Sequence, residues 1–350
     1  MTLHPRRAHA GDREATRPPR RTASPAERDA FVLGQRPPRP ALDPWAHQGV
    51  LVEPEVSASG QIVDVATVFL AGRECPWRCA MCDLWRHTIA DDTPAGALPH
   101  QVRAALAAVH DETGRVPPHV KLYNAGSFFD PRAVPRGDYD AIARELSACS
   151  HVIVESHPAL IGPRVDAWVA SLARARSAIG PPASLEIAMG LETVHPDALE
   201  QLNKRMTADR FARAAEDLAR RGVLLRAFVL VNPPFVPRGA QDEWLTRSVD
   251  FAFDCGASVV SLIPTRSGNG AMDRLAEVGA FVPPTLDDVE RSFEAALARG
   301  AGRVFVDAWD IERCARCATC LPERRARLRE MNLRQAALPH VTCAHCGHAA

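Results

Sequence analysis

The sequence predicts an α/β fold built as a partial, TIM-like (β/α)6 barrel. From residue 65 onward, apolar strand-like runs alternate with segments of helical spacing, the pattern of βα units around a parallel sheet. The chain has 350 residues, and barrels of this class use about 200–250 residues as one domain. Hydrophobic residues make up 46% of the sequence, enough for a sizeable core. We therefore expect one barrel with appended segments.

Six strands are predicted from apolar runs bounded by turn residues. Helical spacing separates them; for example, Val102, Leu106 and Val109 fall on one face of a helix. A short strand at 50–52 comes before the core, and a strand at 303–306 closes it. The six strands are 65–70, 119–123, 152–154, 185–190, 224–231 and 259–264, and the helices are 98–110, 139–149, 159–175, 208–221, 244–255 and 286–298.

Three regions are expected along the chain. Residues 1–45 are rich in Arg and Pro, with few periodic apolar residues, and are predicted to be a disordered leader that either contacts RNA or is simply solvated. Residues 46–300 form the barrel, and residues 301–350 form a small cysteine-rich metal-binding appendage.

Composition narrows the choice of function and location. The 42 basic and 42 acidic residues leave a formal charge of zero, so no overall field attracts nucleic acid or an anionic membrane. No apolar run approaches the length of about 18 residues that a membrane span requires. The N-terminus lacks the apolar region of a secretory signal, and ten cysteines are too few for a disulfide framework. A reducing, cytoplasmic location is expected, with no membrane partner.

Three cysteines follow the strand at 65–70 with C-x3-C-x2-C spacing: Cys75, Cys79 and Cys82. Three thiolates on one short loop can bind three irons of a 4Fe-4S cluster, whose usual complement is four cysteines. One iron is then open to a small molecule. A structural zinc site would need a fourth ligand, which has no candidate nearby in the sequence.

This spacing resembles the signature of the radical S-adenosylmethionine (SAM) superfamily. The resemblance implies that the open iron chelates the amino and carboxylate groups of SAM, and that an electron from the cluster cleaves SAM to a 5'-deoxyadenosyl radical. Within the Elp3/MiaB/NifB-like group, the phrases at 121–130, 154–158 and 190–193 look most like the radical SAM subunits of archaeosine synthase, which modify tRNA. A flavodoxin or ferredoxin is then the expected reductant.

Candidate SAM contacts are sought at the carboxyl ends of the barrel strands, where βα loops converge. A small-residue turn follows the second strand, and acidic residues follow the third and fourth; ordinary turns or ion pairs are the competing interpretations. The resemblance implies SAM contacts from the loop at 124–127, from Glu155 and from Glu192. The thioether of Met81, just before the last motif cysteine, can pack on adenine. No catalytic residue is assigned. The cofactor-binding candidates are Met81, Asn124, Ala125, Gly126, Ser127, Glu155, Glu192 and Arg226, the last opening the fifth strand.

After the sixth strand, the glycine-rich turn at 264–270 suits a carboxylate or phosphate ligand, although such a turn is a weak signal. Near the C-terminus, two C-x2-C pairs lie 22 residues apart, a spacing close to that of a zinc ribbon: Cys317, Cys320, Cys343 and Cys346. The rival interpretation is a second iron-sulfur cluster that also uses Cys314. A basic helix at 324–332 is expected to bridge the two pairs.

The sequence therefore predicts a radical SAM enzyme acting in tRNA or nucleoside modification. One alternative is a radical SAM enzyme for a small molecule or peptide, which the neutral charge favours. Another is a non-catalytic nucleic-acid-binding protein that uses its zinc knuckle. RNA binding requires a basic strip leading to the barrel mouth, and the arginine-rich segment 313–334 is the candidate for it.

Overall fold

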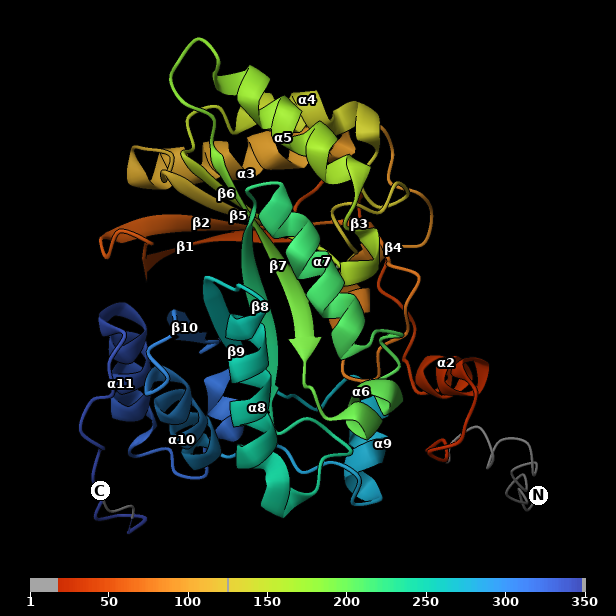
Figure 1. The fold of residues 1–350 in the computed structure, drawn as a ribbon, viewed down its shortest axis with the longest axis vertical. Helices are drawn as coiled ribbons and strands as arrows, with labels where there is room; N and C mark the ends of the chain where they lie inside the picture. Colours follow the sequence, from red (N-terminus) through yellow and green to blue (C-terminus); the bar gives the residue numbers. More distant parts are fainter. Residues whose placement is uncertain (1–17, 125, 348–350) are drawn as a thin grey trace, which may run out of the picture.

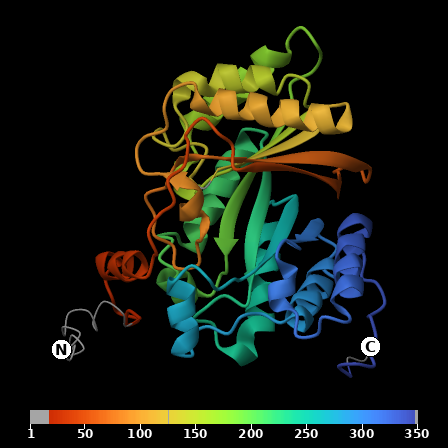
Figure 2. The ribbon, with the colours of Figure 1, turned by 180° about the vertical axis from the view of Figure 1, so that it is seen from behind.

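The computed structural model describes residues 18–124 and 126–347, and its centre is one curled sheet of eight strands (Figures 1 and 2). The strand order is β1-β2-β5-β6-β7-β8-β9-β10; β1 pairs antiparallel with β2, and the other neighbours are parallel. The strands are β1 (Gly49–Val56), β2 (Ile62–Leu70), β5 (His119–Asn124), β6 (His151–Glu155), β7 (Ser184–Glu192), β8 (Leu224–Val231), β9 (Val259–Pro264) and β10 (Arg303–Val306).

Helices cover the outer face of the sheet, as the βα repeat requires (Figure 1). A separate two-stranded sheet pairs β3 (Gly72–Arg73) with β4 (Thr88–Ile89). The helices are α2 (Pro25–Gly34), α3 (Ala97–Thr113), α4 (Tyr139–Glu145), α5 (Pro163–Arg176), α6 (Pro196–Gln201), α7 (Ala208–Arg220), α8 (Gln241–Asp254), α9 (Ala271–Glu277), α10 (Leu286–Leu297) and α11 (Leu321–Arg334).

Strand residues alternate between the helix-covered face and the concave face of the sheet. In β8, Leu225, Ala227 and Val229 belong to the main hydrophobic core, so Arg226 and Phe228 between them face inward. The predicted α/β half-barrel and its six strands are confirmed. β10 lies in the same sheet, so the sheet continues past residue 300, and β1 adds an antiparallel edge.

The leader prediction is wrong for Pro25–Gly34, which forms helix α2, and residues 1–17 lie outside the described part of the chain. Ser24 and Glu27 form a reciprocal capping box: the Glu27 amide donates to Ser24 Oγ (3.3 Å), and the Ser24 amide donates to Glu27 Oε2 (2.6 Å). Phe31 and Val32 are buried in a small apolar cluster with residues of α9. The Arg- and Pro-rich composition of the whole leader obscured this short amphipathic stretch.

A network of charged side chains occupies the concave face near the amino ends of the strands. The Arg226 guanidinium pairs with Glu186 on β7 and with Glu55 on β1, and Lys121 on β5 also pairs with Glu55. Burial raises the pKa of Glu55, but the charges of Arg226 and Lys121 outweigh it and bring the pKa to about 2. Arg226 is thus engaged with two carboxylates near the start of its strand, and its contact with a cofactor stays a prediction.

Helix α11 covers the free edge of β10 with two side-chain amides. Asn332 accepts from the Val306 amide (2.8 Å) and donates to the Val306 carbonyl (3.0 Å). Gln335 makes the same two bonds with Val304, at 2.7 and 2.8 Å. These amides take the place of a neighbouring strand, so the edge is protected from pairing with another chain.

We expect Asn332→Leu to lower the free energy of unfolding by about 1–2 kcal/mol, because the backbone N–H and C=O of Val306 lose their partners while covered by the helix. Urea denaturation measures the change. Arg329→Ala, at an exposed position of the same helix, is the control and should stay within about 0.5 kcal/mol of the unsubstituted chain. Equal effects of the two substitutions would show that the amide does not protect the edge.

No helix within the described residues is both long and apolar enough to cross a bilayer.

Candidate functional site

The three motif cysteines lie on the loop that leaves the carboxyl end of β2 by way of β3. Neighbouring loops fix the backbone of this loop. The Ala80 amide donates to the Leu202 carbonyl (2.9 Å), and the side-chain amide of Asn203 donates to the Arg78 carbonyl (2.8 Å). From the loop after β9, Asn269 donates to the Ala80 carbonyl (2.8 Å). The cysteine loop is therefore held in place by loops that follow β7 and β9.

Of the three motif cysteines, Cys79 is buried, and Cys75 and Cys82 are half-buried. Burial raises the pKa of Cys79 to about 12 and also raises the pKa values of Cys75 and Cys82, and the thiols of Cys75 and Cys79 further raise the pKa of Cys82. Thiolates at this position therefore need a cation to stabilise them. Bound iron meets that need, because thiolates are the ligands of iron-sulfur clusters.

Two further contacts brace the cysteine loop. Glu74, next to the first cysteine, forms ion pairs with Arg36 (2.7 Å), Arg39 and Arg78 (3.2 Å), which tie the loop to the segment after α2. The indole of Trp77 stacks on the imidazole of His157, with ring centroids 3.6 Å apart and planes 11° from parallel. The loop is thus connected to β6 as well as to the N-terminal segment.

His157 is neutral in this arrangement. Its Nδ1 accepts from the Ala159 amide (3.1 Å), so the proton lies on Nε2, which donates to the Lys204 carbonyl (3.0 Å). Burial, with the nearby charge of Lys204, lowers the pKa of His157 to about 3. A neutral ring suits stacking on Trp77, and it adds no charge beside the cysteines.

A buried ion pair lies under the cysteine loop. Glu192, at the end of β7 with φ +67°, pairs with Lys204, and their side chains are 9% and 10% exposed. A Cβ atom at Gly190 would stand 2.1 Å from both Glu192 Oε1 and Lys204 Nζ, so only glycine leaves room for the pair. The Lys204 charge also acts to lower the pKa of Cys79. Glu192 thus forms the ion pair considered for it from sequence, and its contact with SAM stays a prediction.

The loop after β5 presents a buried amide without partners. Neither Oδ1 nor Nδ2 of Asn124 forms a hydrogen bond with the described residues, although the side chain is 2% exposed. A Cβ atom at Gly126 would stand 2.5 Å from the Arg73 carbonyl, so this loop lies directly against the start of the cysteine loop. Ser127 Oγ accepts from the His157 amide (2.9 Å) and is occupied within the fold. Residue 125 lies outside the described residues.

The Glu155 carboxyl ends β6, and it forms no hydrogen bond or ion pair with the described part of the chain. Burial raises the pKa of Glu155 to about 8, with the Lys204 charge opposing this shift and the Glu192 charge adding to it. At neutral pH the carboxyl is therefore largely protonated, and it can donate as well as accept a hydrogen bond. An unpartnered acid and an unpartnered amide on adjacent strands are typical of a binding site.

Glu155→Gln is expected to stabilise the protein at high pH. The folded state holds the Glu155 proton up to a pKa of about 8, whereas the usual value is 4.5, so the stability of the native chain falls as pH rises between these values. The free energy of unfolding of the variant relative to the native chain should be constant below pH 4.5, should rise in the variant's favour between pH 4.5 and 8, and should level off above pH 8. Urea titrations across this range measure it; Glu112→Gln, at an exposed helix position, is the control. A difference that is constant with pH would contradict the assignment.

Two other predictions concern residues near the loop. Met81 packs, partly buried, against the apolar cluster formed by α2 and α9, and its contact with adenine stays a prediction. In the turn at 264–270, the amides of Gly268 and Gly270 both donate to Asp273, at 2.8 Å each. This turn was expected to bind a carboxylate or phosphate ligand, and the side chain of Asp273 supplies the carboxylate instead.

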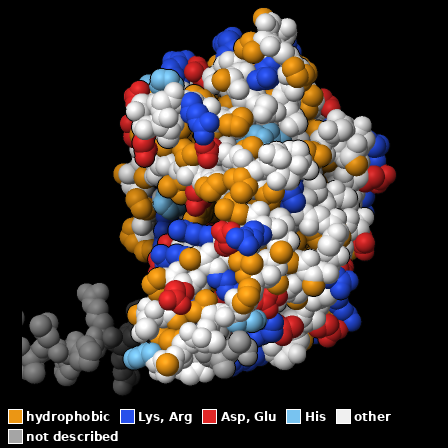
Figure 3. All heavy atoms as spheres, turned by 90° about the vertical axis from the view of Figure 1, so that its left-hand side faces the viewer, with side chains coloured by type: hydrophobic (Ala, Val, Ile, Leu, Met, Phe, Trp, Pro, Cys, Tyr) orange, Lys and Arg blue, Asp and Glu red, His pale blue; other side chains and the backbone are white. Residues whose placement is uncertain are grey.

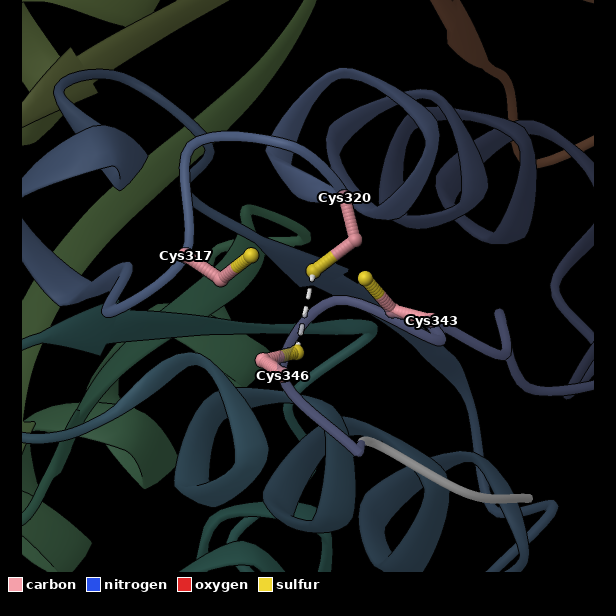
Figure 4. A group of neighbouring side chains, drawn as sticks. All are labelled: Cys317, Cys320, Cys343 and Cys346. Atoms are coloured by element: carbon pink, nitrogen blue, oxygen red, sulfur yellow. Dashed lines mark hydrogen bonds between the residues drawn. The ribbon is translucent and has the colours of Figure 1, made fainter.

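The four C-terminal cysteines come together, as their spacing predicted (Figure 4). Their sulfur atoms all lie within 4.8 Å of one another, and no other group of three such metal-binding side chains among the described residues is as close. Cys314 is buried in the main hydrophobic core, where burial raises its pKa to about 11.

Sequence reasoning missed the residues that hold the cysteine loop in place: Asn203, Asn269, Glu74 and the Trp77–His157 stack. The positive φ of Asn203, +58°, fits an asparagine in a tight turn, and this is a local signal. The other contacts join segments far apart in the chain, and no local pattern indicates them.

Comparison with known proteins gives distant relatives. No protein-family model matches the sequence. Archaeosine synthase subunit beta of Methanosarcina acetivorans is 26% identical over 230 residues, which cover 63% of each chain. The subunit of the same name from Thermococcus kodakarensis is 29% identical over 144 residues, 40% of this chain and 42% of that protein. The chain thus spans less than two thirds of either relative.

Among solved structures, the Elp3 protein of Methanocaldococcus infernus superposes with a TM-score of 0.46 and 14% identity, covering 59% of this chain and 51% of that one. Together, the three-cysteine motif after β2 and the similarity to archaeosine synthase subunit beta relate this chain to the radical SAM superfamily.

Proposed function

We propose that this chain is a radical SAM enzyme whose cluster is bound by Cys75, Cys79 and Cys82. The observation that carries the proposal is the partly buried cysteine loop at the carboxyl end of β2, beside Asn124 and Glu155, which end the next two strands of the sheet and whose side chains have no hydrogen-bond partner among the described residues. Chemistry in βα barrels takes place at this end, where loops from several strands meet.

The residues present fit a 4Fe-4S cluster. Three cysteines leave one iron without a protein ligand, and burial of their thiols disfavours thiolates that are not bound to metal. The chemistry that such a cluster supplies is one-electron reductive cleavage of SAM. The chain's part is to shield the site from water and to place the ammonium of Lys204 near the thiolates.

SAM would be held by groups on the strands beside the loop. The Asn124 amide offers both a donor and an acceptor that nothing in the described chain uses, which suits the carboxylate and amino groups of an amino acid. The protonated carboxyl of Glu155 can bind a hydroxyl or amine, as in a ribose or the methionine moiety. Glu192 would act indirectly, by fixing Lys204.

A nucleoside within tRNA is the substrate that the curated relatives suggest, since they are named as archaeosine synthase subunits. The subunit name also suggests a partner chain, and we propose a flavodoxin or ferredoxin as the electron donor. A reducing compartment suits the oxygen-sensitive cluster and the ten free cysteines, so we propose a cytoplasmic location.

One observation favours the alternative of a small molecule or peptide substrate. Arginines of α11 are engaged in ion pairs, Arg324 with Glu290 and Asp287, and Arg327 with Glu294. On the side of the molecule where α11 lies, Lys and Arg are interspersed with Asp and Glu (Figure 3). This helix therefore provides no continuous basic strip for RNA. A tRNA substrate would need phosphate contacts from another surface or from a partner.

Anaerobic reconstitution with iron and sulfide, followed by reduction in the presence of SAM, tests the activity. We expect the absorbance and EPR signals of a 4Fe-4S cluster, and 5'-deoxyadenosine with methionine as products. Adding unmodified tRNA, or separately a pool of small metabolites, should increase product formation only with the true substrate class. A fully cluster-loaded chain that never cleaves SAM would disprove the proposed function.

A further inference from the structure

We propose that Cys317, Cys320, Cys343 and Cys346 bind a single zinc ion, and that this ion fastens the C-terminal segment to the start of α11. The four side chains come from two segments, the turn before α11 and the segment after it, and their sulfur atoms face a common centre (Figure 4). The inference concerns a site separate from the cysteine loop after β2, and it does not depend on the proposed activity.

The spacing of the sulfur atoms fits one ion. Zinc–sulfur bonds of about 2.3 Å in a tetrahedron place the sulfurs about 3.8 Å apart. Cys320 Sγ and Cys346 Sγ are 3.9 Å apart, and all four sulfurs lie within 4.8 Å of one another. The thiolates of a 4Fe-4S cluster bind four different irons and must be further apart. A disulfide needs a bond of about 2.05 Å, and all four cysteines are free.

The surroundings complete a four-ligand zinc site and supply no fifth thiolate. Backbone amides of Thr319 and Cys320 donate hydrogen bonds to the Cys317 sulfur, which offsets thiolate charge without adding a ligand. Cys314, the extra cysteine of the rival cluster hypothesis, packs in the hydrophobic core. Four thiolates without a further ligand match the closed coordination of structural zinc.

The ion would join the two ends of the segment that covers the edge of the sheet. Between the two cysteine pairs, Arg327 on α11 donates to the carbonyls of Leu338 (3.1 Å) and Pro339 (2.8 Å), which folds the C-terminal segment back along the helix. Asn332 of the same helix and Gln335, the residue directly after it, hold β10. Closing this long loop with a metal restricts the unfolded chain and so stabilises the folded segment.

Metal analysis of the full-length protein tests the site. We expect one zinc per chain, retained in the triple Cys75→Ala, Cys79→Ala, Cys82→Ala variant but lost in Cys320→Ser and Cys343→Ser. Cys255→Ser, at a half-buried cysteine outside both groups, is the matched control and should keep the zinc. Hydrogen exchange in α11 and the segment after it should become at least tenfold faster in Cys343→Ser, while β5 to β8 stay protected.

A second measurement does not depend on how the variants fold. Replacing zinc with cobalt in the unsubstituted chain should give the intense thiolate-to-cobalt charge-transfer bands and the visible d–d bands of tetrahedral tetrathiolate coordination. If the chain binds iron that is lost when the C-terminal cysteines are replaced, the site holds an iron-sulfur cluster and the proposal is overturned. A chain that takes up neither zinc nor cobalt at these cysteines would also overturn it. Loss of SAM cleavage with zinc retained would contradict only the proposed function.

Discussion

Cys79→Ala is expected to abolish formation of 5'-deoxyadenosine and to remove most of the iron that binds after anaerobic reconstitution. Cys79 is the middle ligand of the motif and is buried, so its loss leaves two thiolates and a cavity in place of a cluster ligand. Product is measured chromatographically, and cluster content by iron, sulfide and EPR.

The control for this substitution is Cys255→Ala, which removes a thiol of similar size at the end of α8. It should bind iron and cleave SAM as the unsubstituted chain does. If Cys79→Ala retained a full cluster and normal product formation, the motif cysteines would not be the cluster ligands. The zinc content provides an internal check that the variant has folded.

Lys204→Met should lower the free energy of unfolding by about 3–5 kcal/mol, because it leaves the Glu192 carboxylate buried without a partner. It should also reduce cluster loading, since the ammonium that stabilises thiolates at Cys75 and Cys79 is gone. Denaturant titration of the metal-free chain measures the first effect, and iron content after reconstitution measures the second.

Two further variants separate these effects. The double variant Lys204→Met, Glu192→Gln buries no unpaired charge and should recover much of the stability but not the cluster loading. Lys121→Met breaks the ion pair with Glu55 at the other end of the strands, so it should destabilise the chain without a specific effect on iron binding. Equal losses of iron in Lys204→Met and Lys121→Met would mean that Lys204 acts only through stability.

The sequence predicted the parts of the molecule that depend on local patterns. Alternating apolar runs and helical spacing located the six parallel strands, and the positions of Cys75 and Cys317 within short motifs identified two separate cysteine groups. Both signals are local: strands and helices have fixed periods, and metal ligands on one loop have fixed spacing.

The errors have physical causes of two kinds. The Arg- and Pro-rich composition of residues 1–45 concealed the amphipathic stretch that forms α2. Composition also does not reveal which side chains meet in the folded protein. Phe31 of α2 packs on α9, and Asp273 accepts a hydrogen bond from an amide of the 264–270 turn. How loops from β7 and β9 hold the cysteines could be learned only from tertiary structure.

The chain has only two lysines, and each is held inside the protein by a carboxylate: Lys121 by Glu55 and Lys204 by Glu192. Primary-amine chemistry at side chains, whether enzymatic acetylation, ubiquitin attachment or labelling with succinimidyl esters, therefore has no exposed target on the folded barrel. Acylation of either lysine would report that its end of the barrel had opened. Because the two lysines lie at opposite ends of the strands, mass spectrometry of an acylated sample can tell which end opens first.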